Sequence, residues 1–504
     1  MRIWREVPIF VVLLALSALA MLPPAMLAYS SRDMHVARSF FYIAVLLAAI
    51  VAMLASTTRR PDRNEGAPQQ LLTLFAAYTA LPLVLALPFY EALQTTTLLN
   101  AYFEMVSSFT TTGATQFADP NRLSDALHFW RAIVGWLGGL FVWITAAAVL
   151  APMNLGGFEV ARAQRNEDSG TAFRQIFERS SIQNRISRHA KYLTPIYVAL
   201  TGSVVLIGLA TDEPPLNAVI LAMSTLSTSG ITLLGQVAAA PNFILEAAIF
   251  LFLLPAFTRN FYTQHQGTNM FTKLRLDPEL KLAIGLLIGV SILLFFRHWS
   301  GAFDVNDEDN LQAALAALWG AFFTAASFLS TSGFESAWWE DARNWSGLTT
   351  PGLVLMALAL MGGGVATTAG GIKLLRVYAL YKHGGREMER LVYPSSLGRS
   401  GHEARRIRRA GAFIAWIFFM LFTVSLAAIM VLLSLFGVPF EAALIFSAAA
   451  LTTTGPLAAL ASETPLVYAS LPEPGKLVVI AAMVLGRLEA LALIAVFNPA
   501  IWRR

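Results

Sequence analysis

A five-residue motif occurs four times in this chain, each time between two long apolar stretches. It consists of an apolar residue, a hydroxyl residue, Thr, a second hydroxyl residue and Gly. The copies, roughly 100 to 120 residues apart, are Phe109–Gly113, Leu226–Gly230, Leu329–Gly333 and Leu451–Gly455. An ion that leaves water must find oxygen ligands, and four extended segments around one axis can supply rings of backbone carbonyls. The repeat therefore indicates an ion filter.

The surroundings of the motif are those of a membrane protein. Hydrophobic residues make up 56% of the 504 residues and charged residues only 13%, against about a quarter in soluble domains. The chain has no Cys, which excludes disulfides and thiol chemistry. Ten apolar runs are long enough to span a bilayer, namely 8–28, 39–56, 71–90, 128–152, 192–210, 242–258, 282–297, 350–381, 411–436 and 475–499.

The positions of these runs predict an all-α membrane protein with two N-terminal helices and four helix–pore-loop–helix repeats around a central pseudo-fourfold cation pore. The predicted units are an N-terminal hairpin, 1–70, and pore repeats 71–155, 190–265, 280–381 and 408–504. Each motif follows an apolar segment that is too short to cross a bilayer, namely 101–109, 218–226, 321–329 and 443–451. We expect these segments to be re-entrant half-helices, because non-helical backbone at membrane depth needs a cavity or a protein environment.

Charge is distributed unequally between the two ends of the predicted spans. Arg and Lys cluster in the loops that would lie on one side, including the long basic loops 153–191 and 382–409. Acidic residues such as Asp119, Asp307 and Glu335 lie in the loops beside the motifs. The positive-inside rule predicts that the basic side is cytoplasmic and that the filter mouth faces outside.

Three stretches resemble the Trk/Ktr/HKT superfamily of potassium transporters, most closely the bacterial TrkH type. They are Phe103–Thr115, Gly362–Lys373 and Gly486–Glu489. The resemblance covers nearly the whole chain and implies potassium uptake across the inner membrane by a homodimer without a bound cofactor. It also implies a cytosolic, nucleotide-binding regulatory subunit of the TrkA type, for which the two basic loops are candidate docking surfaces; no nucleic acid is involved.

The resemblance also implies the residues of a K⁺ filter. Backbone carbonyls just before each Gly would bind the ion, and Gly at position 113 implies a preference for K⁺ over Na⁺. The implied filter residues are Thr111, Thr112, Gly113, Thr228, Ser229, Gly230, Thr331, Ser332, Gly333, Thr453, Thr454 and Gly455. A small-residue packing seam is the alternative for one copy; four aligned copies favour the filter.

A Gly-rich stretch interrupts the apolar run 350–381, which predicts a break in that helix. By resemblance it is an intramembrane gate below the filter, with Arg487 of the last span as an electrostatic barrier; a packing seam and a buried ion pair are the alternatives. The gate residues are Gly362, Gly363, Gly364, Thr367, Thr368, Gly370, Gly371 and Arg487. We expect Glu104 to brace backbone groups, and Arg131 and Lys373 to extend to the membrane boundary.

Other classes of function fit the chain less well. An ion-coupled carrier usually has inverted repeats, whereas these repeats run in parallel. An intramembrane enzyme would need a nucleophile and base or a metal cluster, and the apolar runs contain neither. A less selective K⁺/Na⁺ pathway and coupling to H⁺ or Na⁺ remain open.

Overall fold

The computed structural model describes residues 8–57, 67–151, 182–233, 237, 241–258, 260, 274–299, 310–346, 350–393 and 409–489. Within these ranges all regular secondary structure is helical. Seven of the helices described there are long and apolar enough to cross a membrane. The predicted all-α class is confirmed, and the chain is an integral membrane protein.

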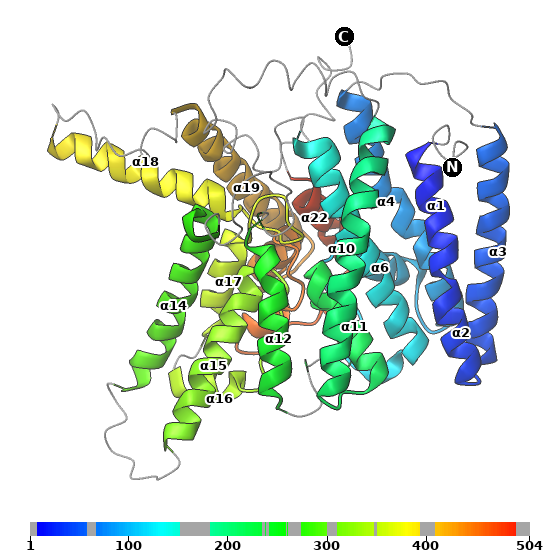
Figure 1. Cartoon of the computed structure of the whole chain (residues 1–504), viewed down its shortest axis with the longest axis horizontal. Helices are drawn as coiled ribbons and strands as arrows, with labels where there is room; N and C mark the ends of the chain where they lie inside the picture. The colour runs from blue at the N-terminus through cyan, green and yellow to red at the C-terminus, as the bar shows by residue number, and fades with distance from the viewer. Residues whose placement is uncertain are drawn as a thin grey trace.

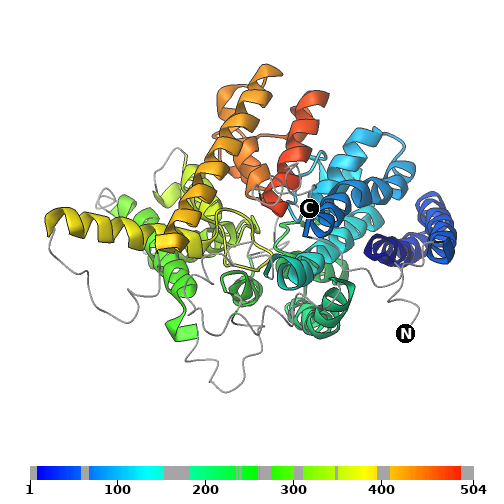
Figure 2. The ribbon, with the colours of Figure 1, turned by 90° about the horizontal axis from the view of Figure 1, so that it is seen from above.

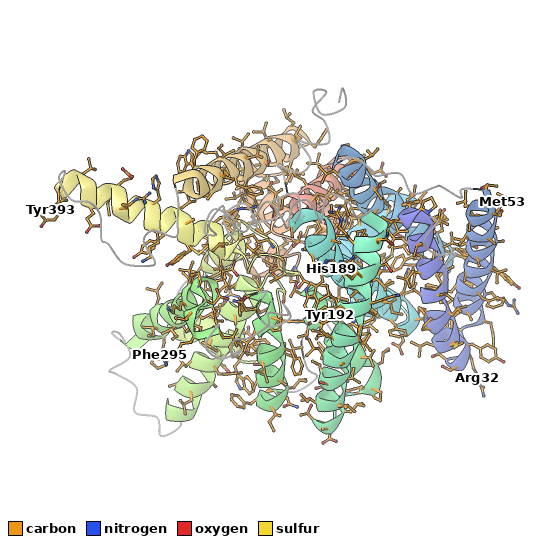
Figure 3. The ribbon with its side chains drawn as sticks, turned by 45° about the horizontal axis from the view of Figure 1, so that its top comes forward. Arg32, Met53, His189, Tyr192, Phe295 and Tyr393 are labelled. Carbon is orange, nitrogen blue, oxygen red and sulfur yellow. The ribbon has the colours of Figure 1, made fainter. Side chains whose placement is uncertain are left out.

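The N-terminal hairpin lies at the edge of the molecule, beside the first helix of the first repeat (Figure 1). Its first arm is a single span made of α1 (Ile9–Ala20) and α2 (Leu22–Ser30), and α3 (Met34–Thr57) returns. Large apolar side chains of α3 are exposed, among them Tyr42 and Met53; Figure 3 labels Met53. Such an exposed apolar face is suited to lipid rather than water.

Each of the four repeats contains a first helix, a half-helix, a motif segment and a second helix. The first helices are α4 (Ala67–Ala92), α10 (Ile182–Ala210), α14 (Pro278–Trp299) and α19 (Arg409–Leu435). The half-helices are α5 (Leu98–Phe109), α11 (Pro215–Ser227), α15 (Asn310–Leu329) and α20 (Phe440–Leu451). The second helices are α6 (Asp125–Thr145), α12 (Phe243–Leu253), α17 (Gly352–Met361) and α22 (Glu473–Leu488).

Seen from above, the repeats surround a common centre (Figure 2). The first repeat, in blue and cyan, lies between the N-terminal hairpin and the orange and red helices of the fourth. The half-helices are buried along their motif-proximal turns; Phe103, Phe328 and Phe446 are at most 1% exposed. Helices buried on all sides need apolar or small residues all round, which explains their Ala- and Ser-rich sequences.

Two features differ from the sequence prediction. The half-helix α15 has 20 residues rather than the short segment expected, although its apolar part is Ala314–Leu329. The sequence predicted a break in the second helix of the third repeat, and the second helices of the other repeats also contain or end in irregular backbone. Helix α6 continues into a π-helical turn (Ala146–Leu150), α12 ends in a 3₁₀ turn (Leu254–Ala256), and α22 ends at Leu488 before Glu489, which has φ +62°.

Candidate functional site

Every half-helix ends in the same way, and the motif is its C-terminal cap. The residue before Gly donates its N–H to a carbonyl five positions earlier, and the central Thr donates its N–H to a carbonyl three positions earlier. In the first repeat these bonds are Thr112 N to Ser107 O, 2.8 Å, and Thr111 N to Ser108 O, 2.9 Å. The other three repeats contain the same pair of bonds. This is a Schellman cap, which satisfies the last helical carbonyls and turns the chain sharply.

The central Thr of each motif adopts left-handed backbone angles. The φ values are +56° for Thr111, +51° for Thr228, +57° for Thr331 and +55° for Thr453. A β-branched residue rarely adopts this conformation, and each such residue costs on the order of 1–3 kcal/mol. Four buried residues with the same strain show that the surrounding helices impose this backbone. The motif itself gives no sign of this conformation at Thr, which is a residue that local preference keeps out of the left-handed region.

The two outer hydroxyls of each motif hydrogen-bond to each other. The oxygen–oxygen distance is 2.8 Å for Thr110 and Thr112, and 3.0–3.2 Å in the other three copies. The first hydroxyl also donates to its own half-helix, as Thr110 Oγ1 does to Val106 O at 2.7 Å. The flanking hydroxyls therefore stabilise the turn, which leaves the backbone carbonyls and the central Thr hydroxyl for other contacts.

The four motif segments contact one another in chain order and close into a ring. In each case a Cβ added to the motif Gly would collide with the next segment. The collisions are Gly113 with Ser229 O, 1.9 Å; Gly230 with Ser332 O, 2.1 Å; Gly333 with Pro456 Cγ, 2.9 Å; and Gly455 with Ala114 N, 2.2 Å. The ring explains why Gly stands at this position of all four motifs, since any side chain would separate neighbouring segments.

The fourth segment departs from the symmetry of the ring. Gly113, Gly230 and Gly333 have φ between +64° and +78°, whereas Gly455 is not in the left-handed region. The amide of Gly455 donates to Thr112 O at 2.6 Å, so the fourth segment is bonded to the first. The pyrrolidine ring of Pro456 lies beside the second and third segments, since a Cβ added to Gly230 or to Gly333 would be 2.9 Å from its Cγ.

The Gly-rich stretch leaves the helix as predicted. Helix α17 ends at Met361 and α18 (Leu374–Val392) begins after Lys373, so Gly362–Lys373 form a loop. We call this segment the Gly-rich loop. Val365, Thr367, Thr368 and Ala369 are at most 2% exposed. Buried non-helical backbone needs hydrogen-bond partners, and the loop obtains several of them from neighbouring repeats.

The Gly-rich loop touches the ring directly. Its Gly370 N donates to Thr331 Oγ1 at 2.7 Å. A Cβ on Gly370 would lie 2.1 Å from Thr452 O and 2.5 Å from Thr453 Oγ1. The loop thus packs against the third and fourth motifs on the side of the central Thr hydroxyls.

Arg487 joins the loop to the first motif. Its guanidinium donates from Nη1 to Thr368 O at 2.6 Å and from Nη2 to Thr111 Oγ1. The residue is 8% exposed, and no carboxylate of the described residues lies within ion-pair distance of it. Glu489, two positions later, pairs instead with Arg376 Nη2 of α18 at 2.8 Å. Neutral oxygens do not cancel the charge of a buried cation, and a low dielectric constant strengthens its action on a neighbouring charge.

The segments that leave the ring are braced by carboxylates. Glu104 of α5 accepts hydrogen bonds from Gln116 N and from Thr115 Oγ1 (2.9 Å), as expected, and pairs with Arg131 Nε at 2.9 Å. The prediction that Arg131 and Lys373 extend to the membrane boundary is wrong. They are 5% and 7% exposed, Arg131 because it neutralises Glu104 and Lys373 because its ammonium donates to Ala369 O in the Gly-rich loop.

Sequence reasoning missed a second brace, Glu246 of α12. Its carboxylate accepts bonds from Ala337 N at 2.7 Å, and from Ser336 Oγ and Trp319 Nε1 at 2.8 Å each. It thereby fixes the segment that follows the third motif. The available signal was a lone carboxylate within an otherwise apolar helix, which is a functional indication by default.

The Gly-rich loop is also anchored on its far side. Gly364 N donates to Ala256 O at 2.9 Å, and Val365 N to Glu279 Oε1 at 3.3 Å. Asp277 accepts bonds from Thr258 Oγ1 and from Asn260 Nδ2 (2.7 Å), which fastens the end of the second repeat beside the loop. The loop is therefore connected to the second, third and fourth repeats at once.

A ring of four re-entrant segments inside four helix–loop–helix units defines a polytopic membrane protein of the cation-transporting class. The family model described as TrkH, cation transport protein, matches residues 37–504. The chain belongs to this family.

Curated relatives match along nearly the full length. The chain is 28% identical to the Trk system potassium uptake protein TrkH of Salmonella typhimurium strain LT2, with 96% of each protein covered. It is 26% identical to the Trk system potassium uptake protein TrkG of Escherichia coli strain K12, over 97% of this chain and 96% of that protein. The crystal structure of the potassium transporter TrkH from Vibrio parahaemolyticus shares the fold, with a TM-score of 0.81, 24% identity and full coverage of both chains.

Proposed function

We propose that this protein takes up K⁺ across the cytoplasmic membrane through the ring of four motif segments. The observation that carries the proposal is the closure of the ring in chain order, with every Gly in contact with the next segment. The carbonyls just before each Gly would replace the hydration shell of the ion. The filter residues are then the twelve named from the sequence, from Thr111 to Gly455. The names of the curated relatives, potassium uptake proteins of the Trk system, support K⁺ as the transported ion.

The Gly-rich loop and Arg487 would form the gate beneath this filter. Two observations support this role: the loop bonds to Thr331, and Arg487 bonds both to the loop and to Thr111. A cation that has passed the ring would meet a buried positive charge in a medium of low dielectric constant. Opening then requires that the loop and Arg487 move together.

The working assembly would be a homodimer in the bacterial inner membrane, with the filter mouth outside and a cytosolic nucleotide-binding subunit of the TrkA type. The naming of the relatives as parts of a Trk system supports a multi-component assembly. Helix α18, which starts at the Gly-rich loop, projects away from the bundle, with Tyr393 just beyond its end (Figures 1 and 3). A partner that binds α18 could therefore act on the loop. Much of the two basic loops, 153–181 and 394–408, lies outside the described residues.

The test is cation flux into liposomes that contain the purified protein. Entry of K⁺, Rb⁺, Na⁺ and Li⁺ is compared with and without a proton gradient. K⁺ and Rb⁺ should enter faster than Na⁺ and Li⁺. Equal entry of all four ions favours the less selective pathway, for which the asymmetric fourth segment is the structural argument; an absolute requirement for the proton gradient favours symport. Absence of any cation flux from folded protein refutes the proposal.

A further inference from the structure

Two backbone carbonyls of the fourth motif accept hydrogen bonds from the residues that follow it. The short helix α21 (Leu457–Leu460) begins immediately after the fourth motif. Its first two amides donate backward, from Leu457 N to Thr454 O and from Ala458 N to Gly455 O, both at 3.2 Å. Gly455 O therefore already accepts one hydrogen bond, which leaves it less lone-pair capacity for an ion.

Tyr468 adds a second hydrogen bond to the carbonyl of Gly455. Its hydroxyl donates to Gly455 O at 2.9 Å, so this carbonyl accepts two hydrogen bonds. The phenol is 4% exposed and is clamped between Phe446 of α20 and Phe103 of α5, at ring-centroid distances of 4.9 and 5.7 Å. Two aromatic neighbours on different repeats fix the direction of the hydroxyl.

The corresponding carbonyls of the other repeats are open. Among the hydrogen bonds of the described residues, none ends on the carbonyl of Gly113, Gly230 or Gly333. These three Gly also share left-handed backbone angles, which Gly455 lacks. The difference in hydrogen bonding therefore coincides with the difference in backbone conformation.

We infer that the outermost ion site of the filter is three-sided, built from the carbonyls of Gly113, Gly230 and Gly333, and that Tyr468 is the positioning residue that keeps Gly455 out of it. The inference rests on the proposed function. The number and field strength of the carbonyls around an ion decide between K⁺ and Na⁺. An ion at this level would keep water on the side of the fourth repeat, and the site would discriminate less than a four-sided one.

The first test measures flux in liposomes for Tyr468→Phe, which removes one of the two bonds to Gly455 O. The K⁺/Na⁺ flux ratio should rise and the half-saturating K⁺ concentration should fall, each by roughly 2- to 10-fold, the range that corresponds to one hydrogen bond. Tyr102→Phe is the matched control, because the Tyr102 hydroxyl donates to Thr79 O at 3.1 Å between α5 and α4. The control should change thermal stability only.

The second test does not depend on a variant. Rb⁺ is located by anomalous diffraction in crystals of the unaltered protein, and its distances to the four Gly carbonyls are compared. Shorter distances to Gly113, Gly230 and Gly333 than to Gly455 support the inference; four equal distances overturn it. A Tyr468→Phe protein that folds and keeps the original K⁺/Na⁺ flux ratio also overturns it, while leaving the proposed function intact. Absence of K⁺ flux in the unaltered protein overturns both this inference and the proposed function.

Discussion

Gly113→Ser is the most direct perturbation of the ring. A Cβ at this position would lie 1.9 Å from Ser229 O, and real contacts of this kind do not fall below 3.0 Å. The carbonyl of the neighbouring segment must therefore move by about 1 Å, since packed interiors do not absorb such an overlap. The left-handed φ of +73° adds strain of about 1–2 kcal/mol for any residue with a side chain.

The displaced carbonyl is one of the proposed ligands, so selectivity should suffer more than flux. A loss of about 1.4 kcal/mol in the preference for K⁺ corresponds to a tenfold lower ratio. This amount is at the lower end of one hydrogen bond to a charged group, about 1.5–3 kcal/mol. We therefore expect the K⁺/Na⁺ flux ratio in liposomes to fall by about tenfold, and Gly113→Ala to have a similar effect because the Cβ alone is responsible.

Gly289→Ser is the matched control. Gly289 lies in α14, and a Cβ there would have nothing within 4 Å. This variant should keep the original flux ratio. If Gly113→Ser and Gly333→Ser both fold and both keep the original K⁺/Na⁺ ratio, the ring is not the filter and the reasoning fails.

Four further predictions concern the gate, the brace and the mouth. Deletion of Gly363–Thr368 should raise basal K⁺ flux. If the basal K⁺ flux of the folded deletion variant equals that of the original protein, the loop is only a packing seam. Arg487→Gln should also raise K⁺ flux, with Arg487→Lys closest to the original; lower thermal stability without faster flux would contradict the barrier. Glu104→Gln should lower the free energy of unfolding by about 3–5 kcal/mol, because it leaves the buried Arg131 charge unpaired. A thermal unfolding midpoint equal to that of the original protein would argue against the brace. Burial raises the pKa of Glu335, beside the third motif, so its charge is lost at a higher pH than that of an ordinary carboxylate. K⁺ flux at low K⁺ concentration should fall as the pH drops through this pKa. Glu335→Gln should remove that dependence from the pH profile.

The sequence by itself determined the membrane class and the fourfold plan. Runs of apolar residues without charges can only be buried in lipid or protein, and four copies of one motif at regular spacing define four units. The break after Met361 was also readable, because a cluster of Gly cannot sustain a helix. A lone carboxylate in an apolar helix, as at Glu104, already indicated a specific buried role.

Only the tertiary structure decided how these parts meet. The left-handed Thr residues arise because crowded neighbouring segments fix the backbone, whereas local preference alone would oppose that conformation. Arg487 reaches Thr111 from 376 positions away in the sequence. The asymmetry at Gly455 comes from Tyr468, a residue outside the motif that the fold carries back to it. Such contacts depend on the packing of distant helices, and no local pattern in the chain records which partner a buried polar group will find.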